Sequence, residues 1–132
     1  MREIEFRGKS VDSGKWFYGS LVINKDGTCE ITDGAEHYGY LRISVQVIPE
    51  TVGQFTGIID SYDNKIYEGD VVIANGNKRC GKYTTYVVFN KNCFMLDDNK
   101  TIFIDNMSLI NVEVIGNIYD NPEFLGGSDG KE

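Results

Sequence analysis

The stretch Lys65-Ile66-Tyr67-Glu68-Gly69-Asp70-Val71-Val72 decides the fold class, because it combines strand-forming residues with a glycine placed as a turn. Isoleucine, tyrosine and valine favour strands, and a Gly-Asp pair accepts the tight backbone of a turn. The pattern predicts a sharp turn that leads into a strand, and we assign a strand to residues 66–74. Upstream, residues 51–60 are expected to form a short helical turn or an extended loop, since Gly53 and Gly57 disfavour a full helix.

Toward the N-terminus the sequence predicts a β-meander. Asn24-Lys25-Asp26-Gly27 is a hairpin signal, because Asp-Gly accepts the positive φ of tight turns. In residues 41–47 apolar and polar side chains alternate, which is typical of a strand with one buried face, and Pro49 ends that strand. The strands expected here are 2–7, 15–24, 28–32 and 41–47.

Toward the C-terminus short strands alternate with turns, at residues 82–90, 93–96, 101–104 and 112–118, with a helical turn at 107–111. The whole pattern predicts a mainly β fold: a small SH3-like or partly open β-barrel, preceded by the meander, with one or two short helical turns. We expect one domain over 1–124, made of the meander (1–48) and a barrel-like lobe (49–124). Residues 125–132 are expected to form a disordered tail.

The composition indicates an ordinary globular protein, with 132 residues, 41% hydrophobic and 25% charged. No apolar run approaches the roughly 18 residues of a membrane span, so we expect no membrane association. The start of the chain lacks the apolar core of a signal peptide, which favours the cytoplasm. Cys29, Cys80 and Cys93 are odd in number and widely spaced, so free thiols in a reducing compartment are the simplest interpretation.

Residues able to carry out chemistry are scarce. His37 is the only histidine and lies in an expected loop. Glu68 and Asp70 share one strand face and could hold a cation, but we prefer Asp70 as the cap of the turn at Gly69. Asp97-Asp98-Asn99-Lys100 is interpreted as a hairpin turn, because the calcium-loop pattern is missing. Phosphate-binding loops and a nucleophile elbow are also absent from the sequence, which predicts neither an enzyme nor a cofactor.

A small basic segment is a candidate for nucleic-acid contact. Lys78, Arg79 and Lys82 are followed by Tyr83 and Tyr86, so cations and stacking rings could share one face. The alternative is an ordinary solvated loop between two strands. The net charge of −7 disfavours nucleic acid as a partner.

Trp16, Phe17 and Tyr18 form an aromatic run in an expected strand. Successive strand residues point to opposite faces, so Phe17 cannot share a face with Trp16 and Tyr18. Either both faces are covered within one chain, or one of them meets another subunit. The second alternative predicts self-association through Trp16, Phe17 and Tyr18.

Several separated segments resemble the YopX family, whose members are small proteins of phage and prophage origin in bacteria. The segments are Arg2–Arg7, Lys15–Gly19, Pro49–Gly57, Ile66–Val72, Val87–Phe89 and Val114–Glu123. The resemblance covers nearly the whole chain and implies a mainly β fold, a mobile-element origin and a bacterial host cell. It brings no catalytic residues, so no site is carried over from it.

Three functional hypotheses follow. The leading one is a non-enzymatic, phage-derived β module that forms homo-oligomers or binds a host protein. The second is a regulatory module that touches RNA or single-stranded DNA through Lys78, Arg79 and Lys82. In the third, the acidic surface imitates nucleic acid and occupies a basic host protein.

Overall fold

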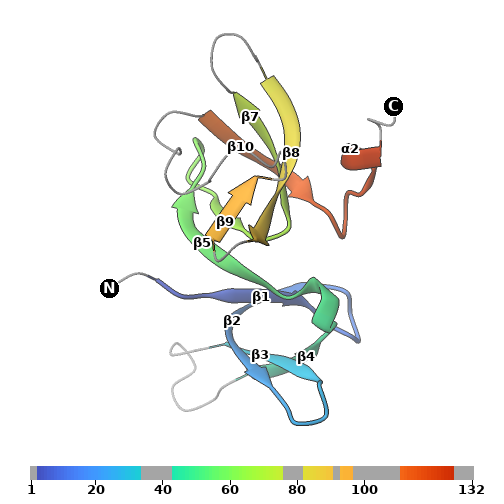
Figure 1. Cartoon of the computed structure of the whole chain (residues 1–132). Helices are drawn as coiled ribbons and strands as arrows, with labels where there is room; N and C mark the ends of the chain where they lie inside the picture. The colour runs from blue at the N-terminus through green and yellow to red at the C-terminus, as the bar shows by residue number, and fades with distance from the viewer. Residues whose placement is uncertain (1–2, 34–42, 76–81, 91–92, 97–110, 127–132) are drawn as a thin grey trace. The chain divides into compact units, whose positions relative to one another are not determined.

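The computed structural model describes residues 3–33, 43–75, 82–90, 93–96 and 111–126. The chain divides into two compact units, Met1–Phe55 (unit 1) and Thr56–Glu132 (unit 2). Each unit has a buried apolar cluster of its own. Figure 1 labels most of the elements of both units.

Almost all the elements are strands. Unit 1 contains β1 (Phe6–Lys9), β2 (Trp16–Ile23), β3 (Cys29–Asp33), β4 (Ile43–Val47), the 3-10 helix η2 (Pro49–Thr51) and the start of β5 (Gly53–Ile59). Unit 2 contains the end of β5, β6 (Lys65–Tyr67), β7 (Asp70–Asn75), β8 (Lys82–Asn90), β9 (Cys93–Leu96), β10 (Asn111–Asn117) and the short helix α2 (Glu123–Gly126).

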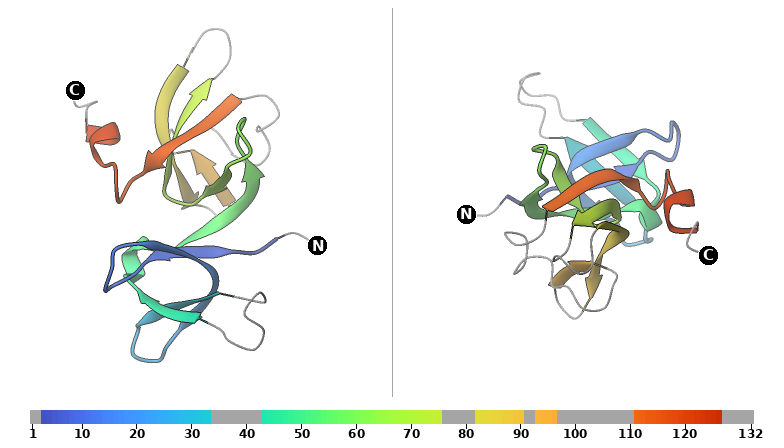
Figure 2. Two further views of the ribbon diagram at one scale, coloured as in Figure 1. Left: turned by 180° about the vertical axis from the view of Figure 1, so that it is seen from behind. Right: turned by 90° about the horizontal axis from the view of Figure 1, so that it is seen from above.

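The sheet of unit 1 is antiparallel, with the order β4-β3-β2-β1-β5. The first half of β2 pairs with β1 and its second half pairs with β3. Between the two halves β2 curves strongly, as Figures 1 and 2 show. A bridge between Ser10 and Val47 brings the end of β4 back against the end of β1.

The core of unit 1 is small and lies inside this curled sheet. Its buried residues are Cys29, Ile31 and Val47, and Phe6, Phe17, Leu21 and Val52 pack against them. The predicted hairpin between β2 and β3 is confirmed, with a hydrogen bond from Asn24 N to Thr28 O and a positive φ at Gly27.

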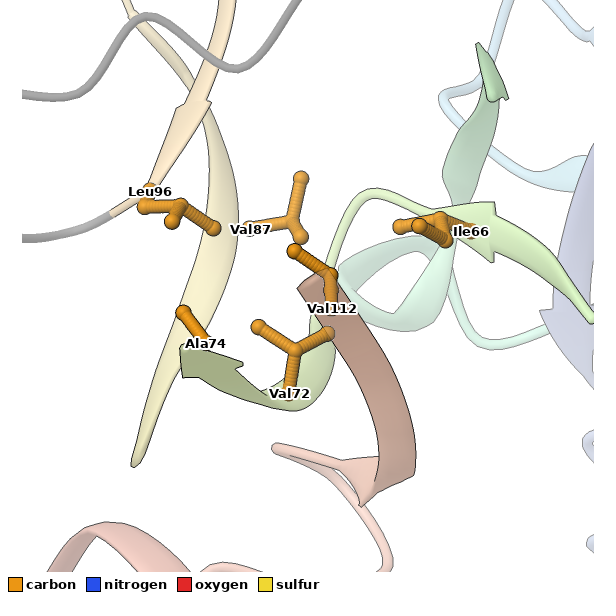
Figure 3. Close-up of a cluster of buried hydrophobic side chains, with 6 residues drawn as sticks. All are labelled: Ile66, Val72, Ala74, Val87, Leu96 and Val112. Carbon is orange, nitrogen blue, oxygen red and sulfur yellow. The ribbon is translucent and has the colours of Figure 1, made fainter. Parts of the chain in front are cut away.

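The main sheet of unit 2 is antiparallel, with the order β10-β7-β8-β9. Its inner side chains meet in a cluster of Ile66, Val72, Ala74, Val87, Leu96 and Val112. These side chains come from β6, β7, β8, β9 and β10. Figure 3 shows how the six lie. Valine dominates the cluster, in keeping with the preference of β-branched residues for strands.

The mainly β fold predicted from the sequence is confirmed, as two antiparallel sheets, and the described strands do not close into a barrel. Three local predictions were wrong. Residues 53–59 form a strand because β1 supplies a partner, with Phe6 opposite Gln54. The strand expected over 66–74 is two strands separated by the turn at Glu68 and Gly69, and β1 begins at Phe6 instead of Arg2.

Some predictions fall outside the described residues. These are the strand at 101–104 and most of the helical turn at 107–111. The last residue of that turn, Asn111, is described and begins β10. Of the expected tail, Leu125 and Gly126 belong to α2, and residues 127–132 lie outside the described part of the chain.

Candidate functional site

The outer face of β2 carries the candidate site. Phe17 and Leu21 point inward and pack on the core of unit 1. Because side chains alternate along a strand, Trp16, Tyr18 and Val22 lie on the opposite face. We call these three residues the β2 outer face. Tyr18 is 45% exposed and Val22 is 42% exposed, so the apolar character of this face reaches solvent.

Two cations border the first half of this face. Arg7 lies opposite Tyr18 and Lys9 lies opposite Trp16 in the β1–β2 register. The guanidinium carbon of Arg7 is 4.6 Å from the centre of the Trp16 ring, and Lys9 Nζ is 5.9 Å from it. The negative face of an indole attracts a cation, so this contact helps to compensate Arg7, which is only 6% exposed.

A polar network borders the second half. Glu30 lies opposite Val22, and its carboxylate accepts hydrogen bonds from Ser44 Oγ (2.6 Å) and Asn24 Nδ2 (3.0 Å). These two bonds, the one from Ser44 first, hold the pKa of Glu30 below its ordinary value. In the hairpin turn, the side-chain and backbone hydrogen bonds from Thr28 likewise lower the pKa of Asp26. Both carboxylates are therefore ionised at neutral pH.

In unit 2, Asp70 acts as a structural cap. It is 2% exposed, and its Oδ2 accepts the Tyr67 backbone N–H at 2.7 Å, across the turn at Glu68 and Gly69. Gly69 has a φ of 93°, in a region that glycine enters without strain. The interpretation of Asp70 as a turn cap is confirmed.

The same turn is joined to the end of β10. Gly69 donates its N–H to Val87 O, and its carbonyl accepts the N–H of Ile118, both at 2.9 Å. Asn117 Oδ1 accepts two backbone N–H groups of the next turn, from Tyr119 and Asp120. Asn121 Oδ1 accepts the Asn117 N–H at 3.2 Å. We call Gly69, Asp70, Asn117 and Asn121 the turn clasp.

Asp60 is a second structural carboxylate that sequence reasoning missed. Its oxygens accept backbone N–H groups from Tyr62, Asn64 and Val114. Burial works to raise the pKa of Asp60, but these bonds and one from the Asn64 side chain outweigh it, so the pKa lies below its ordinary value. The signal was present, since an aspartate that opens a Ser-Tyr-Asp-Asn turn commonly accepts such bonds.

The structure does not test the predicted nucleic-acid contact, because the side chains concerned lie outside the described residues. Lys78 and Arg79 lie outside the described residues, and Lys82 opens β8 opposite Asn75, with its side chain likewise outside them. His37, Cys80 and residues 97–100 also fall outside. Cys29 and Cys93 are free thiols.

Two kinds of feature are absent from the described residues. No group of three or more His, Cys, Asp or Glu side chains in them is placed to hold a metal ion. None of their helices has the length and the apolar character to cross a membrane.

Of the predicted association residues, the structure separates Phe17 from Trp16 and Tyr18. Phe17 belongs to the core, whereas Trp16 is half-buried beside two cations and Tyr18 is exposed. The sequence indicated the aromatic run, but it gave no sign that Arg7 lies against Trp16. That contact depends on the register of β1 with β2.

The arrangement is that of a small, mainly β protein that presents an apolar strand face between charged groups. The sequence matches the family model described as YopX protein over residues 5–126, so the chain belongs to the YopX family and the resemblance is confirmed. A crystal structure of protein EF1440 from Enterococcus faecalis has a similar fold, with a TM-score of 0.62 and 17% sequence identity. The match covers 95% of this chain and 99% of that one. Among curated proteins none matches.

Proposed function

We propose that the protein is a non-enzymatic binding module, which associates with further copies of itself or with a host protein through the β2 outer face. A single observation carries the proposal: β2 keeps Phe17 and Leu21 inside while Tyr18 and Val22, on the other face, remain 45% and 42% exposed.

The free energy available from this face is sufficient for weak association. Full burial of a valine or isoleucine side chain contributes about 1.5–3 kcal/mol. Tyrosine adds a large rigid ring with a polar end, a combination that is enriched at protein interfaces. Removing Tyr18 and Val22 from water together can therefore drive reversible association.

The remaining parts of the proposal come from the sequence. Its only histidine is His37, and it contains neither a phosphate-binding loop nor a nucleophile elbow, which supports a binding role over catalysis. The family resemblance supports a phage or prophage origin, and with it the cytoplasm of a bacterial host cell.

The test is the mass of the protein in solution as a function of concentration, by sedimentation equilibrium. We expect reversible self-association of the natural chain, weakened at least about tenfold in Tyr18→Thr/Val22→Thr. Threonine keeps the strand preference of these positions while removing apolar surface. The matched control is Ile59→Thr/Tyr62→Thr in unit 2, whose side chains are 49% and 68% exposed.

Control variants that associate like the natural chain would support the assignment to β2. If the natural chain remains a monomer at every concentration, self-association is contradicted. An equal loss in both double variants would contradict the specific role of the β2 outer face.

A further inference from the structure

The outer edge of β10, in unit 2, is occupied by the turn that joins β5 to β6. Among the described strands, β10 stands at the end of its sheet and pairs with β7 along one side. On its other side the Ser61 N–H donates to Val112 O at 3.1 Å, and Asp60 Oδ2 accepts the Val114 N–H at 2.9 Å. The Ser61 hydroxyl donates to the same Val112 oxygen at 3.3 Å. The turn therefore takes the place that the next strand of the sheet would have.

A further strand would use the same backbone groups. Val112 and Val114 are two residues apart, so both direct their N–H and C=O groups to the side away from β7. An open row of such groups is a template for a strand from another chain. Ser61 supplies a donor and Asp60 an acceptor at these positions, as a neighbouring strand would.

The composition of β10 favours pairing. Its sequence, Asn-Val-Glu-Val-Ile-Gly-Asn, has three β-branched apolar residues and one charge. Beyond Val114 the register with β7 shifts before Gly116, and such bulges make an edge unsuitable for further pairing. The regular part of the edge is therefore Asn111–Val114, and this is the part that the turn covers.

We propose that the turn at Asp60 and Ser61 is a cover that keeps strands of other chains from adding to the β10 edge. It excludes an extended polypeptide of any sequence, because the groups that it blocks belong to the backbone. The cover is fixed from within: Asp60 Oδ1 accepts the N–H groups of Tyr62 and Asn64, both at 2.8 Å, while Oδ2 reaches Val114. This inference concerns unit 2 alone and does not depend on the β2 outer face.

Asp60→Asn removes one contact of the cover and keeps the turn. The oxygen of an asparagine amide can still accept the N–H groups of Tyr62 and Asn64. Its NH2 group, however, replaces the oxygen that accepts the Val114 N–H, and it cannot accept this bond.

Ser61→Pro removes the other contact and also keeps the turn. Ser61 is the second residue of a turn in which the Asp63 N–H donates to Asp60 O at 3.2 Å, and proline is favoured at this position. Proline has neither an N–H nor a hydroxyl, so both donors to Val112 O are lost.

The experiment uses the full chain with Asp60→Asn/Ser61→Pro, in the Tyr18→Thr/Val22→Thr background so that the β2 outer face does not contribute. We expect assemblies rich in β structure, at protein concentrations at least about tenfold below those that the background variant needs. Sedimentation velocity measures their size, and thioflavin T fluorescence reports their β structure.

Amide hydrogen exchange tests the opening of the edge itself, in dilute monomeric samples. The Val114 N–H should exchange at least about tenfold faster in the double variant, because it loses a bond to a charged group. The N–H of Glu113 points to the opposite side, toward β7, and its exchange reports any general loss of stability. The ratio of the two rates therefore isolates the edge.

The matched control is Asp70→Ala in the same background, which weakens unit 2 at the Gly69 turn and leaves the β10 edge covered. It should remain as monomeric as the background variant. Circular dichroism checks folding. If Asp70→Ala does not fold, the milder Asp70→Asn replaces it. If the double variant does not fold, Asp60→Asn and Ser61→Pro are measured singly, each with a smaller effect in the same direction.

An increase in the ratio of the Val114 and Glu113 rates, together with assembly of the double variant and not of the control, supports the cover. An unchanged ratio overturns it, and so does an increased ratio without assembly. Equal assembly of the control would assign the effect to lost stability and would also overturn the proposal. None of these outcomes bears on association through β2.

Discussion

Unit 1 and unit 2 use their apolar residues in opposite ways. Among the described residues, unit 1 has four buried hydrophobic residues and five exposed large hydrophobic residues. Unit 2 has nine buried hydrophobic residues and four exposed large ones. The core of unit 1 is a cluster of three residues, and that of unit 2 is a cluster of six. Unit 2 is the better-packed body, and unit 1 leaves a larger share of its large apolar side chains exposed.

The polar residues show the same division. In unit 2 the segments that identify the family supply the turn clasp, where Asp70, Asn117 and Asn121 accept backbone N–H groups. These carboxylate and amide side chains hold turns together. In unit 1 the charged side chains Lys9 and Glu30 border an exposed face instead.

The largest effect is expected from Asp70→Ala in unit 2. Removal of this buried carboxylate leaves the Tyr67 N–H without its acceptor and should lower the free energy of unfolding by about 2–3 kcal/mol. Urea unfolding measures the change, with Glu113→Ala on the exposed face of β10 as the control. A loss below about 0.5 kcal/mol, the range of ordinary surface substitutions, would show that the turn clasp does not stabilise unit 2.

The next largest effect is expected from Gly116→Ala, which should lower the free energy of unfolding by about 1–3 kcal/mol. A Cβ at position 116 would overlap the Asn121 side chain, whose oxygen accepts the Asn117 N–H. The effect is best isolated by a double-mutant cycle with Asn121→Ala, in which the alanine removes the obstacle. If Gly116→Ala costs the same in both backgrounds, the close approach is not the cause.

Asp60→Asn should lower the free energy of unfolding by about 1–2 kcal/mol at pH 7, and by much less in acid. The pKa of Asp60 is lowered by folding, so its contribution is present above its ordinary value of 3.8 and is lost as the pH falls through the folded value. The difference in free energy of unfolding between the natural chain and the variant should stay constant from pH 7 to about pH 5 and narrow below that, as the carboxylate becomes protonated. If the difference in free energy of unfolding does not change with pH, the charge of the Asp60 carboxylate is not the source of its stabilising effect.

The smallest effect on stability is expected from Tyr18→Thr/Val22→Thr in unit 1. Exposed strand residues replaced by another strand former should change the free energy of unfolding of the monomer by less than about 0.5 kcal/mol each. The same variant should lose self-association, so these side chains should matter for association and not for the stability of the monomer. A large loss of stability in dilute solution would mean that these side chains support the fold of unit 1.

Local patterns were enough to predict much of the fold. The Asp-Gly hairpin after β2, the alternation in β4 and the turn at Gly69 depend on neighbours in sequence. β5 was missed because its strand character comes from β1, about fifty residues earlier, which outweighs two glycines. Asp60 was missed because its bond to Val114 spans 54 positions.

The candidate site was predictable only in part. The run Trp16-Phe17-Tyr18 marked a strand with apolar residues on both faces, but only the structure shows which of them the core takes. The cations beside Trp16 and the carboxylate opposite Val22 depend on pairing between strands. Register of this kind is not encoded in any short segment of sequence.

The most direct test uses Trp16, the only tryptophan in the chain and part of the β2 outer face. Its fluorescence reports whether that face is covered when copies associate. On dilution, the emission should shift to longer wavelength over the same concentrations at which sedimentation records dissociation, and Tyr18→Thr/Val22→Thr should give the shifted spectrum throughout. A spectrum that stays constant while the mass changes would place the contact elsewhere and contradict the account.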